Sequence, residues 1–255
     1  MGKQASYAAR ERRIAKAVAQ QRARQRVRAL VVAGGFVIVG LVVAIAVSLI
    51  SAGGRDSAAD SPDSQQPYIT PTIATANGAL AFGEARAPVK LEIYLDYMCP
   101  YCGRFERANS AELDRMVADG TVRIELYPLS FLDRMSNGTR YSTRAANAIA
   151  TVAHRAPDKL QAFNDALFAN QPAEGTSGLS DDQISKLARG AGVPPETAAQ
   201  FTERIFEPWV VASTSAALNN GISATPTVKI NGTLFSGDLY TLGPLTRAIV
   251  AAKGP

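Results

Sequence analysis

The longest apolar stretch of the chain, Ala29 to Ile50, runs for 22 residues without a charged side chain, and Ser48 is its only polar residue. As a helix rising about 1.5 Å per residue it would reach roughly 33 Å, enough to cross a hydrocarbon core of about 30 Å. We therefore predict a single N-terminal transmembrane helix over residues 29–51. A cleaved signal peptide, with its shorter apolar region of roughly 7–15 residues, and a buried core helix are the alternatives.

The next segment, residues 52–77, is rich in Ser, Ala, Gly, Asp and Pro and shows no sustained periodicity. Such a composition cannot bury a core, so we expect a flexible linker there. From residue 78 onward the pattern is that of a folded domain. Val89 to Leu95 is a β-branched and aromatic run that is typical of a core strand. Gly103 to Val117 has helix-forming composition, with Phe105, Leu113 and Met116 on its inner face.

Helical patterns fill the middle of this domain, from about residue 138 to 219. The predicted helices cover Tyr141–Ala153, Lys159–Ala169, Asp181–Ala191 with Ser180 as the N-cap, and Pro195–Leu218. After them, Val228 to Phe235 alternates around Asn231-Gly232, which is the strongest short signal for a two-residue hairpin turn.

The positive charge is concentrated at one end of the chain. The 255 residues carry a net charge of +5, but residues 1–28 hold nine basic groups and one acid, and residues 29–255 are left with a net charge of −3. Basic residues close to a span stay on the cytoplasmic side. We therefore predict a cytoplasmic tail over residues 1–28, an extracytoplasmic domain on the cell membrane, and no binding of nucleic acid by that mildly acidic domain.

The chain has two cysteines, Cys99 and Cys102, separated by Pro100 and Tyr101. Four explanations of this pair are possible: a structural disulfide staple, half of a zinc site, two buried thiols, or a redox-active dithiol. A staple across so short a loop would contribute only roughly 2 kcal/mol. A closed zinc site needs four ligands, and the chain has a single histidine, His154. These arguments favour a redox-active dithiol without a metal or a further cofactor.

The predicted elements place Cys99 where a strand leads into a helix. Pro100 is tolerated in the first helical turn because its missing N–H would have no partner there. Free backbone N–H groups and the positive end of the helix dipole would then stabilise a thiolate at Cys99. We expect Cys99 to be the attacking and attacked sulfur, and Cys102, one turn into the helix, to be the more buried resolving thiol.

Three motifs resemble those of the DsbA-type thiol-disulfide oxidoreductases of the thioredoxin superfamily. They are LDYMCPYC at residues 95–102, YPL at residues 127–129 and ATPT at residues 224–227. The resemblance covers roughly residues 78–255 and implies an α/β, thioredoxin-like fold with an inserted helical domain over about residues 138–219. On the residues alone, Pro226 is compatible with either a trans or a cis peptide bond.

The resemblance also implies roles for individual residues. Pro226 is expected to be cis and to lie against the active-site disulfide, and Thr225 to offer backbone hydrogen bonds to the bound substrate chain. Strongly oxidising members often have His at the position of Tyr101, so we expect a less extreme potential. Many thioredoxin-like proteins have a buried acid at the position of Ile93, and we suggest that Asp96 or water exchanges a proton with Cys102 instead.

The function expected from these observations is that of a membrane-tethered thiol oxidase, which donates its Cys99–Cys102 disulfide to reduced exported proteins. The resemblance implies that a quinone-linked membrane oxidase of the DsbB or VKOR type reoxidises it, with the lipid bilayer as the second partner. A disulfide reductase or isomerase of the same fold is the main alternative. A non-catalytic, peptide-binding chaperone module is the alternative from a different class.

Overall fold

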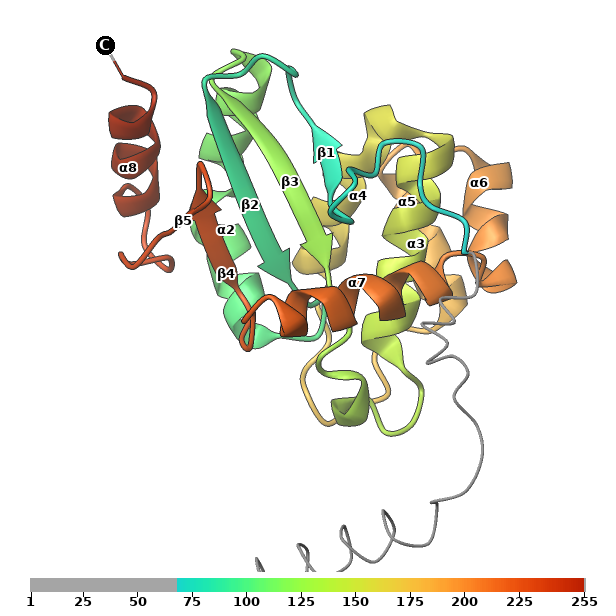
Figure 1. Cartoon of the computed structure of the whole chain (residues 1–255). Helices are drawn as coiled ribbons and strands as arrows, with labels where there is room; N and C mark the ends of the chain where they lie inside the picture. The colour runs from blue at the N-terminus through green and yellow to red at the C-terminus, as the bar shows by residue number, and fades with distance from the viewer. Residues whose placement is uncertain (1–67, 255) are drawn as a thin grey trace, which may run out of the picture. The chain divides into compact units, whose positions relative to one another are not determined.

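The computed structural model of the chain describes residues 68–254 (Figure 1). The predicted tail, the predicted anchor at 29–51 and most of the predicted linker lie outside the described residues. Within residues 68–254, no helix combines the length and the apolar character needed to span a bilayer.

A mixed sheet of five strands forms the centre of the domain, in the order β1-β3-β2-β4-β5. The strands are β1 Leu80–Phe82, β2 Val89–Leu95, β3 Val122–Pro128, β4 Thr227–Ile230 and β5 Thr233–Leu234. β2 and β3 are parallel, while β1 and β4 pair antiparallel with β3 and β2. Six of the seven residues in each central strand are buried, because both faces of the sheet are covered.

The helix α2, Pro100–Ala118, connects β2 to β3 and lies behind these strands in Figure 1. Its buried side chains include the predicted Phe105, Leu113 and Met116. The helix α8, Pro244–Ala252, packs beside α2. The opposite face of the sheet carries a smaller apolar cluster, which contains the stacked rings of Tyr94 and Tyr127 and Ala217 of α7, Glu207–Asn219.

The inserted helical part surrounds α3, Tyr141–Arg155, in which twelve of the fifteen residues are buried. Its alanines let neighbouring helices approach closely. The other helices are α4 Leu160–Ala169, α5 Asp181–Gly190 and α6 Pro195–Ala199, together with the short 3₁₀ helices Asp133–Met135, Pro157–Lys159 and Gln200–Glu203. The N-cap prediction is confirmed, because Ser180 and Gln183 form a capping box at the start of α5.

The expectation of a continuous helical segment over Pro195–Leu218 is wrong. The segment consists of α6, a 3₁₀ turn and α7, and the break contains Arg204 in the left-handed region, with φ of 58°. The side chain of Asn147, in α3, stabilises this break through two hydrogen bonds to its backbone. Its side-chain amide donates to the carbonyl of Phe201 at 2.9 Å and accepts from the N–H of Phe206 at 3.0 Å. These two bonds satisfy buried backbone groups that a continuous helix would have paired internally.

The hairpin prediction is confirmed. β4 and β5 are joined by Asn231 and Gly232, both with positive φ, of 50° and 83°. Two such residues in succession are typical of a type I′ turn, whose twist matches that of the two strands.

Candidate active site

The two cysteines lie where β2 leads into α2. Cys99 is the N-cap residue of α2, with an extended backbone, and Pro100 begins the helix. Both cysteines are free thiols and both are buried, with 5% exposure for Cys99 and none for Cys102. The order of exposure is the one expected from their positions, since Cys99 lies at the helix end and Cys102 one turn inside it.

The surroundings give the two thiols opposite acidities. The pKa of Cys99 is lowered to about 6, first by a hydrogen bond from the Cys102 thiol and then by the side chain of Thr225 and the backbone N–H groups of Cys102 and Tyr101. Burial, followed by the interaction with Cys99, raises the pKa of Cys102 well above its usual range. At neutral pH the pair therefore consists of a Cys99 thiolate and a Cys102 thiol.

The backbone N–H groups of Cys102 and Tyr101, at the start of α2, lower the pKa of Cys99 as expected. The largest cause of the lowered pKa is the Cys102 thiol, which the sequence did not single out as a hydrogen-bond donor. A charge-assisted hydrogen bond from an adjacent donor is worth more than a bond between neutral groups.

Thr225 lies directly beside Cys99, and Pro226 follows it in the chain. The peptide bond between them is cis, as the resemblance implied. In its protonated form the Cys99 thiol donates a hydrogen bond to the carbonyl of Thr225, with 3.3 Å between sulfur and oxygen, although 126 residues separate the two positions. The tertiary structure thus brings together the two motifs that the sequence analysis identified separately.

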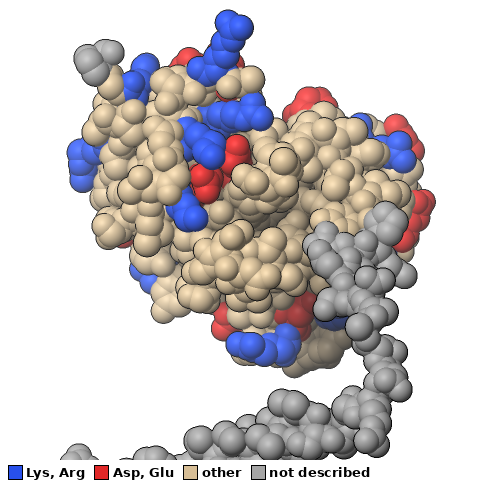
Figure 2. Space-filling view, viewed as in Figure 1, with Lys and Arg blue, Asp and Glu red and all other residues tan. Residues whose placement is uncertain are grey.

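A groove of about 480 Å³ opens next to this contact. It is lined by Cys99, Ser130, Phe131, Leu132, Arg134, Glu174, Thr214, Leu218, Ser223, Ala224 and Thr225. Figure 2 shows a broad uncharged surface over α7, where Val211 is 50% exposed and Leu218 52% exposed. Exposed apolar surface beside a reactive sulfur is suited to binding an extended, partly apolar peptide.

Tyr101 is 53% exposed, and its ring lies 5.8 Å from the ring of Tyr240, measured between centroids. The guanidinium of Arg104 lies 4.7 Å from the Tyr240 centroid and 5.7 Å from that of Tyr101. Only the backbone of Tyr101 helps to stabilise the Cys99 thiolate.

Asp96 is completely buried three residues before Cys99, and its carboxylate accepts three hydrogen bonds. The donors are the N–H of Met98 at 2.8 Å, the N–H of Leu132 at 2.9 Å and the hydroxyl of Ser142 at 2.7 Å. Burial is the main cause that raises its pKa to about 6. Asp96 therefore joins the active-site loop to α3 and to the residues after β3, while its suggested proton exchange with Cys102 stays a prediction.

Gln171, which no sequence motif marked as part of the site, also holds the active-site loop. Its amide donates to the carbonyls of Tyr97 at 3.1 Å and Cys99 at 2.8 Å. Gly103 makes this approach possible, because a Cβ at that position would overlap the Gln171 side chain. Gln171 lies 72 residues from Cys99 in a loop, and no local pattern marks it.

Metal ligands do not cluster at this site. Within residues 68–254, no three His, Cys, Asp or Glu side chains are arranged so that they could hold a metal ion.

The family model for thioredoxin matches residues 75–247. Among curated proteins, the chain is 34% identical over 160 residues to the serine/threonine-protein kinase PknE of Mycobacterium tuberculosis strain H37Rv. That match covers 61% of this chain and only 28% of the kinase, so the chain spans little more than a quarter of that relative.

Two solved structures from Mycobacterium tuberculosis show the same fold. The reduced disulfide bond oxidoreductase DsbG is 27% identical, with a TM-score of 0.62, and the match covers 72% of this chain and 91% of that chain. Reduced DsbA is 26% identical, with a TM-score of 0.61, and the match covers 70% of this chain and 93% of that chain. The similarity thus spans most of the part that the structure describes and nearly all of each relative.

Proposed function

Because the chain belongs to the thioredoxin family, we propose that it is a protein disulfide oxidoreductase whose Cys99–Cys102 disulfide is donated to reduced exported proteins. The similarity to DsbA and DsbG supports disulfide exchange as the chemistry. The observation that carries the proposal is the asymmetry of the two sulfurs. Cys99 is acidic and lies on a groove, while Cys102 is a weak acid without exposure.

The reaction begins from the oxidised form. A substrate thiolate attacks the Cys99 sulfur, the Cys99–Cys102 bond breaks, and its electron pair leaves on Cys102, which takes up a proton. A second substrate thiolate then attacks the substrate sulfur of the mixed disulfide and releases Cys99 as a thiolate. The substrate has gained a disulfide and the enzyme holds the dithiol.

The groove supports an extended substrate chain during this exchange. Thr225, whose carbonyl oxygen lies 3.3 Å from the Cys99 sulfur, offers a backbone edge next to that sulfur. Leu218 and Phe131 supply apolar contact in the same groove. We infer that the substrate cysteine lies above Cys99, with an apolar neighbour of that cysteine between these two side chains.

The lowered pKa of Cys99 favours donation of the disulfide. With a pKa of about 6 instead of about 8.5, the dithiol form gains about 1.4 kcal/mol at pH 7, equivalent to about 30 mV. A dithiol that is stabilised in this way gives up its disulfide more readily. The solvent-exposed Tyr101 adds no imidazole donor, so we expect an oxidant of intermediate strength.

A redox titration of the domain decides between an oxidase and the alternative, a reductase or isomerase. We expect a reduction potential clearly above that of thioredoxin. A value near or below about −250 mV would contradict the oxidase assignment.

Trapping of substrates tests the chemistry directly. In a Cys102→Ser chain the resolving thiol is absent, so mixed disulfides between Cys99 and exported proteins should accumulate. The matched control, Cys99→Ser, keeps the buried thiol and should form none. If neither variant yields covalent adducts, the non-catalytic peptide-binding module becomes the better account.

Location and recycling complete the proposal. The predicted anchor at 29–51 and the basic tail at 1–28 would hold the domain outside the cytoplasmic membrane, next to a quinone-linked oxidase of the DsbB or VKOR type. Because the anchor would keep the domain and that oxidase in the same membrane, it would raise their effective concentration for each other. Protease added to intact cells or spheroplasts should digest the domain and spare the tail, and the opposite pattern would refute this topology.

A further inference from the structure

The side chain of Arg104, in α2, lies over two aromatic rings. Its guanidinium carbon is 4.7 Å from the ring centroid of Tyr240 and 5.7 Å from that of Tyr101. The two rings are 5.8 Å apart between centroids and tilted by 51°, so the three side chains form one cluster. None of the three lines the groove at Cys99. The aromatic cluster is therefore a surface distinct from that groove.

The aromatic cluster lies close to the reactive sulfur. The backbone N–H of Tyr101 is one of the donors that lower the pKa of Cys99, so the residue that carries one ring also contacts the sulfur. Burial, followed by the charges of Cys102 and Cys99, raises the pKa of Tyr240, which indicates that its hydroxyl lies near both sulfurs. An extended chain advances about 3.3 Å per residue, so a substrate side chain about two or three positions from the reacting cysteine can reach the Arg104 guanidinium.

Hydrogen bonds hold the loop that carries Tyr240. The side-chain amide of Asn109, in α2, donates to the carbonyl of Leu239 at 2.8 Å, and Asn109 is buried. The carboxylate of Asp238 accepts from the N–H of Tyr240 at 2.7 Å and from the hydroxyl of Thr241 at 2.6 Å. These bonds fix the backbone beneath the Tyr240 ring before any substrate binds. The guanidinium that the ring supports is therefore preorganised, which lowers the entropic cost of binding.

The charge of Arg104 is available to a binding partner. The residue is exposed, and it takes part in none of the ion pairs formed within residues 68–254. The hydroxyl of Thr241 and, to a smaller extent, the charge of Arg104 lower the pKa of Asp238, but both oxygens of Asp238 accept hydrogen bonds from its own loop. A guanidinium that stacks on aromatic rings keeps its N–H edge free, and that edge matches the two oxygens of a carboxylate.

We propose that Arg104 recognises an acidic side chain close to the reacting cysteine of the substrate, a specificity that rests on the function proposed above. The carboxylate of that Glu or Asp accepts two hydrogen bonds from the edge of the guanidinium. Tyr101 and Tyr240 are positioning residues, because their rings hold the guanidinium in place. The substrate class is then a chain that carries both an apolar and an acidic residue near a reduced cysteine.

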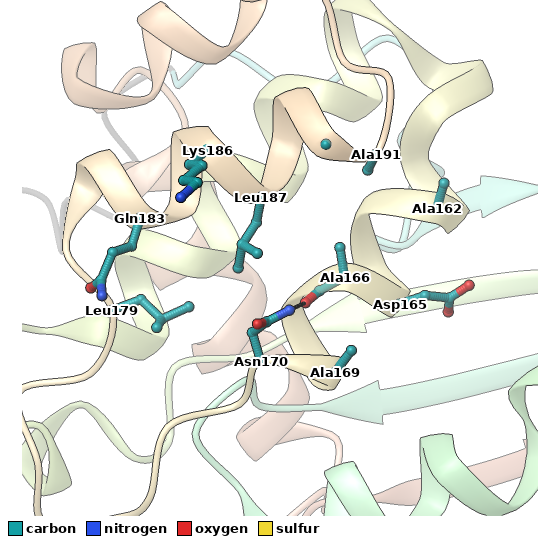
Figure 3. Close-up of a pocket in the computed structure, with 11 residues that line it drawn as sticks. Ala162, Asp165, Ala166, Ala169, Asn170, Leu179, Gln183, Lys186, Leu187 and Ala191 are labelled. Carbon is teal, nitrogen blue, oxygen red and sulfur yellow. Dashed lines mark hydrogen bonds between the residues drawn. The ribbon is translucent and has the colours of Figure 1, made fainter.

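A basic residue elsewhere on the domain provides a comparison. A cleft of about 720 Å³ lies between α4 and α5, and Lys186 is the one basic residue among the described residues that line it (Figure 3). This cleft shares no lining residue with the groove at Cys99, and it includes no member of the aromatic cluster. A preference for acidic peptides that arises in the cleft would depend on Lys186 and not on Arg104.

The test is the initial rate at which the oxidised chain forms mixed disulfides with short peptides that contain one reduced cysteine. The peptides are blocked at both ends and carry one Glu at any of the three positions before or after the cysteine, or Gln at the same position. Each rate is divided by the ionised fraction of the peptide thiol. At one or two positions we expect the Glu peptide to react about 2-fold to 5-fold faster than its Gln counterpart, as for an exposed ion pair. Equal rates at all positions would overturn the proposal.

Variants assign this Glu-to-Gln rate ratio to individual residues. A change in the reactivity of Cys99 cancels, because both peptides react with the same variant. Arg104→Gln should lower the ratio to about one, and Arg104→Lys, which keeps the charge without the planar edge, should retain part of it. Tyr240→Phe keeps the ring and should keep the ratio, whereas Tyr240→Leu should lower it. Arg107→Gln, on the same helix, and Lys186→Gln, at the cleft, are the matched controls and should leave the ratio unchanged.

Two results would refute the role of Arg104. One is an unchanged ratio in folded Arg104→Gln. The other is an equal loss in Arg107→Gln or in Lys186→Gln, which would assign the preference to general electrostatic attraction or to the cleft. If the unmodified oxidised chain reacts with none of the peptides, the proposed function fails rather than the role of Arg104.

Discussion

The hydrogen bond from Cys102 to Cys99 can be tested by replacing the donor. Cys102→Ala removes it, whereas Cys102→Ser keeps a hydroxyl at the same place. A hydrogen bond to a charged group contributes about 1.5–3 kcal/mol, which corresponds to about one to two pH units in a pKa. From a value of about 6, the pKa of Cys99 should rise to roughly 7–8 in the alanine variant.

Alkylation by iodoacetamide measures this directly, because only the thiolate reacts. At pH 6 about half of Cys99 is ionised in the reduced chain. The alanine variant should have about 1–9% thiolate at that pH, so its alkylation should be slower by roughly 5-fold to 50-fold. In both variants Cys99 is the only cysteine, and the rates are therefore free of a second reacting thiol.

The serine variant shows whether a slower reaction is due to the lost hydrogen bond. The pH midpoint of its alkylation rate should stay close to that of the unmodified reduced chain. In the unmodified chain, differential alkylation distinguishes Cys99 from Cys102. If the alanine and serine midpoints coincide, Cys102 is not the main cause of the acidity, and the start of α2 would have to be. A midpoint above pH 8 in the unmodified chain would refute the thiolate assignment altogether.

Three further predictions follow from the buried contacts. Asn147→Ala should lower the free energy of unfolding by about 2 kcal/mol or more, because it leaves two buried backbone groups unpaired, whereas Asn170→Ala, at an exposed position, should change it little in the same urea titration. Gln171→Ala should speed amide hydrogen exchange in residues 96–99, and Gly103→Ala should reproduce this effect by displacing the Gln171 side chain. Slow exchange in both variants would show that the hydrogen bonds of Gln171 do not hold the active-site loop. The depressed Cys99 pKa should stabilise the reduced chain relative to the oxidised one by about 1.4 kcal/mol at pH 7, and this advantage should vanish as pH falls through about 6, a trend that urea titrations of both forms at several pH values will reveal or exclude.

Local signals predicted most of the elements correctly. The strand Val89–Leu95 has the bounds predicted for it, and the hairpin turns at Asn231-Gly232. In both cases neighbouring residues carry the information, through β-branched side chains that suit a buried strand and a residue pair that suits positive φ. The start of α2 at Pro100 was predicted from a local signal too, because a proline is tolerated in the first helical turn.

The errors and omissions have one physical origin. The break between α6 and α7 depends on Asn147, which reaches it from another helix. Gln171 and Asn164 gain their importance only because folding brings them to the active-site loop, where Gln171 donates to the carbonyl of Cys99 and Asn164 accepts from the hydroxyl of Tyr97. A polar residue in a helical pattern gives the same sequence signal whether its side chain will be solvated or buried, so these contacts have no signature in the sequence.

The sequence by itself determined that two cysteines share one helix end, that a Thr-Pro pair precedes a hairpin, and that the basic charge is confined to residues 1–28. Only the tertiary structure decided how acidic each sulfur is and which groups contact it. Thr225 contacts Cys99 across 126 residues of chain, and burial separates the pKa of Cys102 from that of Cys99. Acidity depends on the distance to donors and on exclusion from water, and both quantities exist only after the chain has folded.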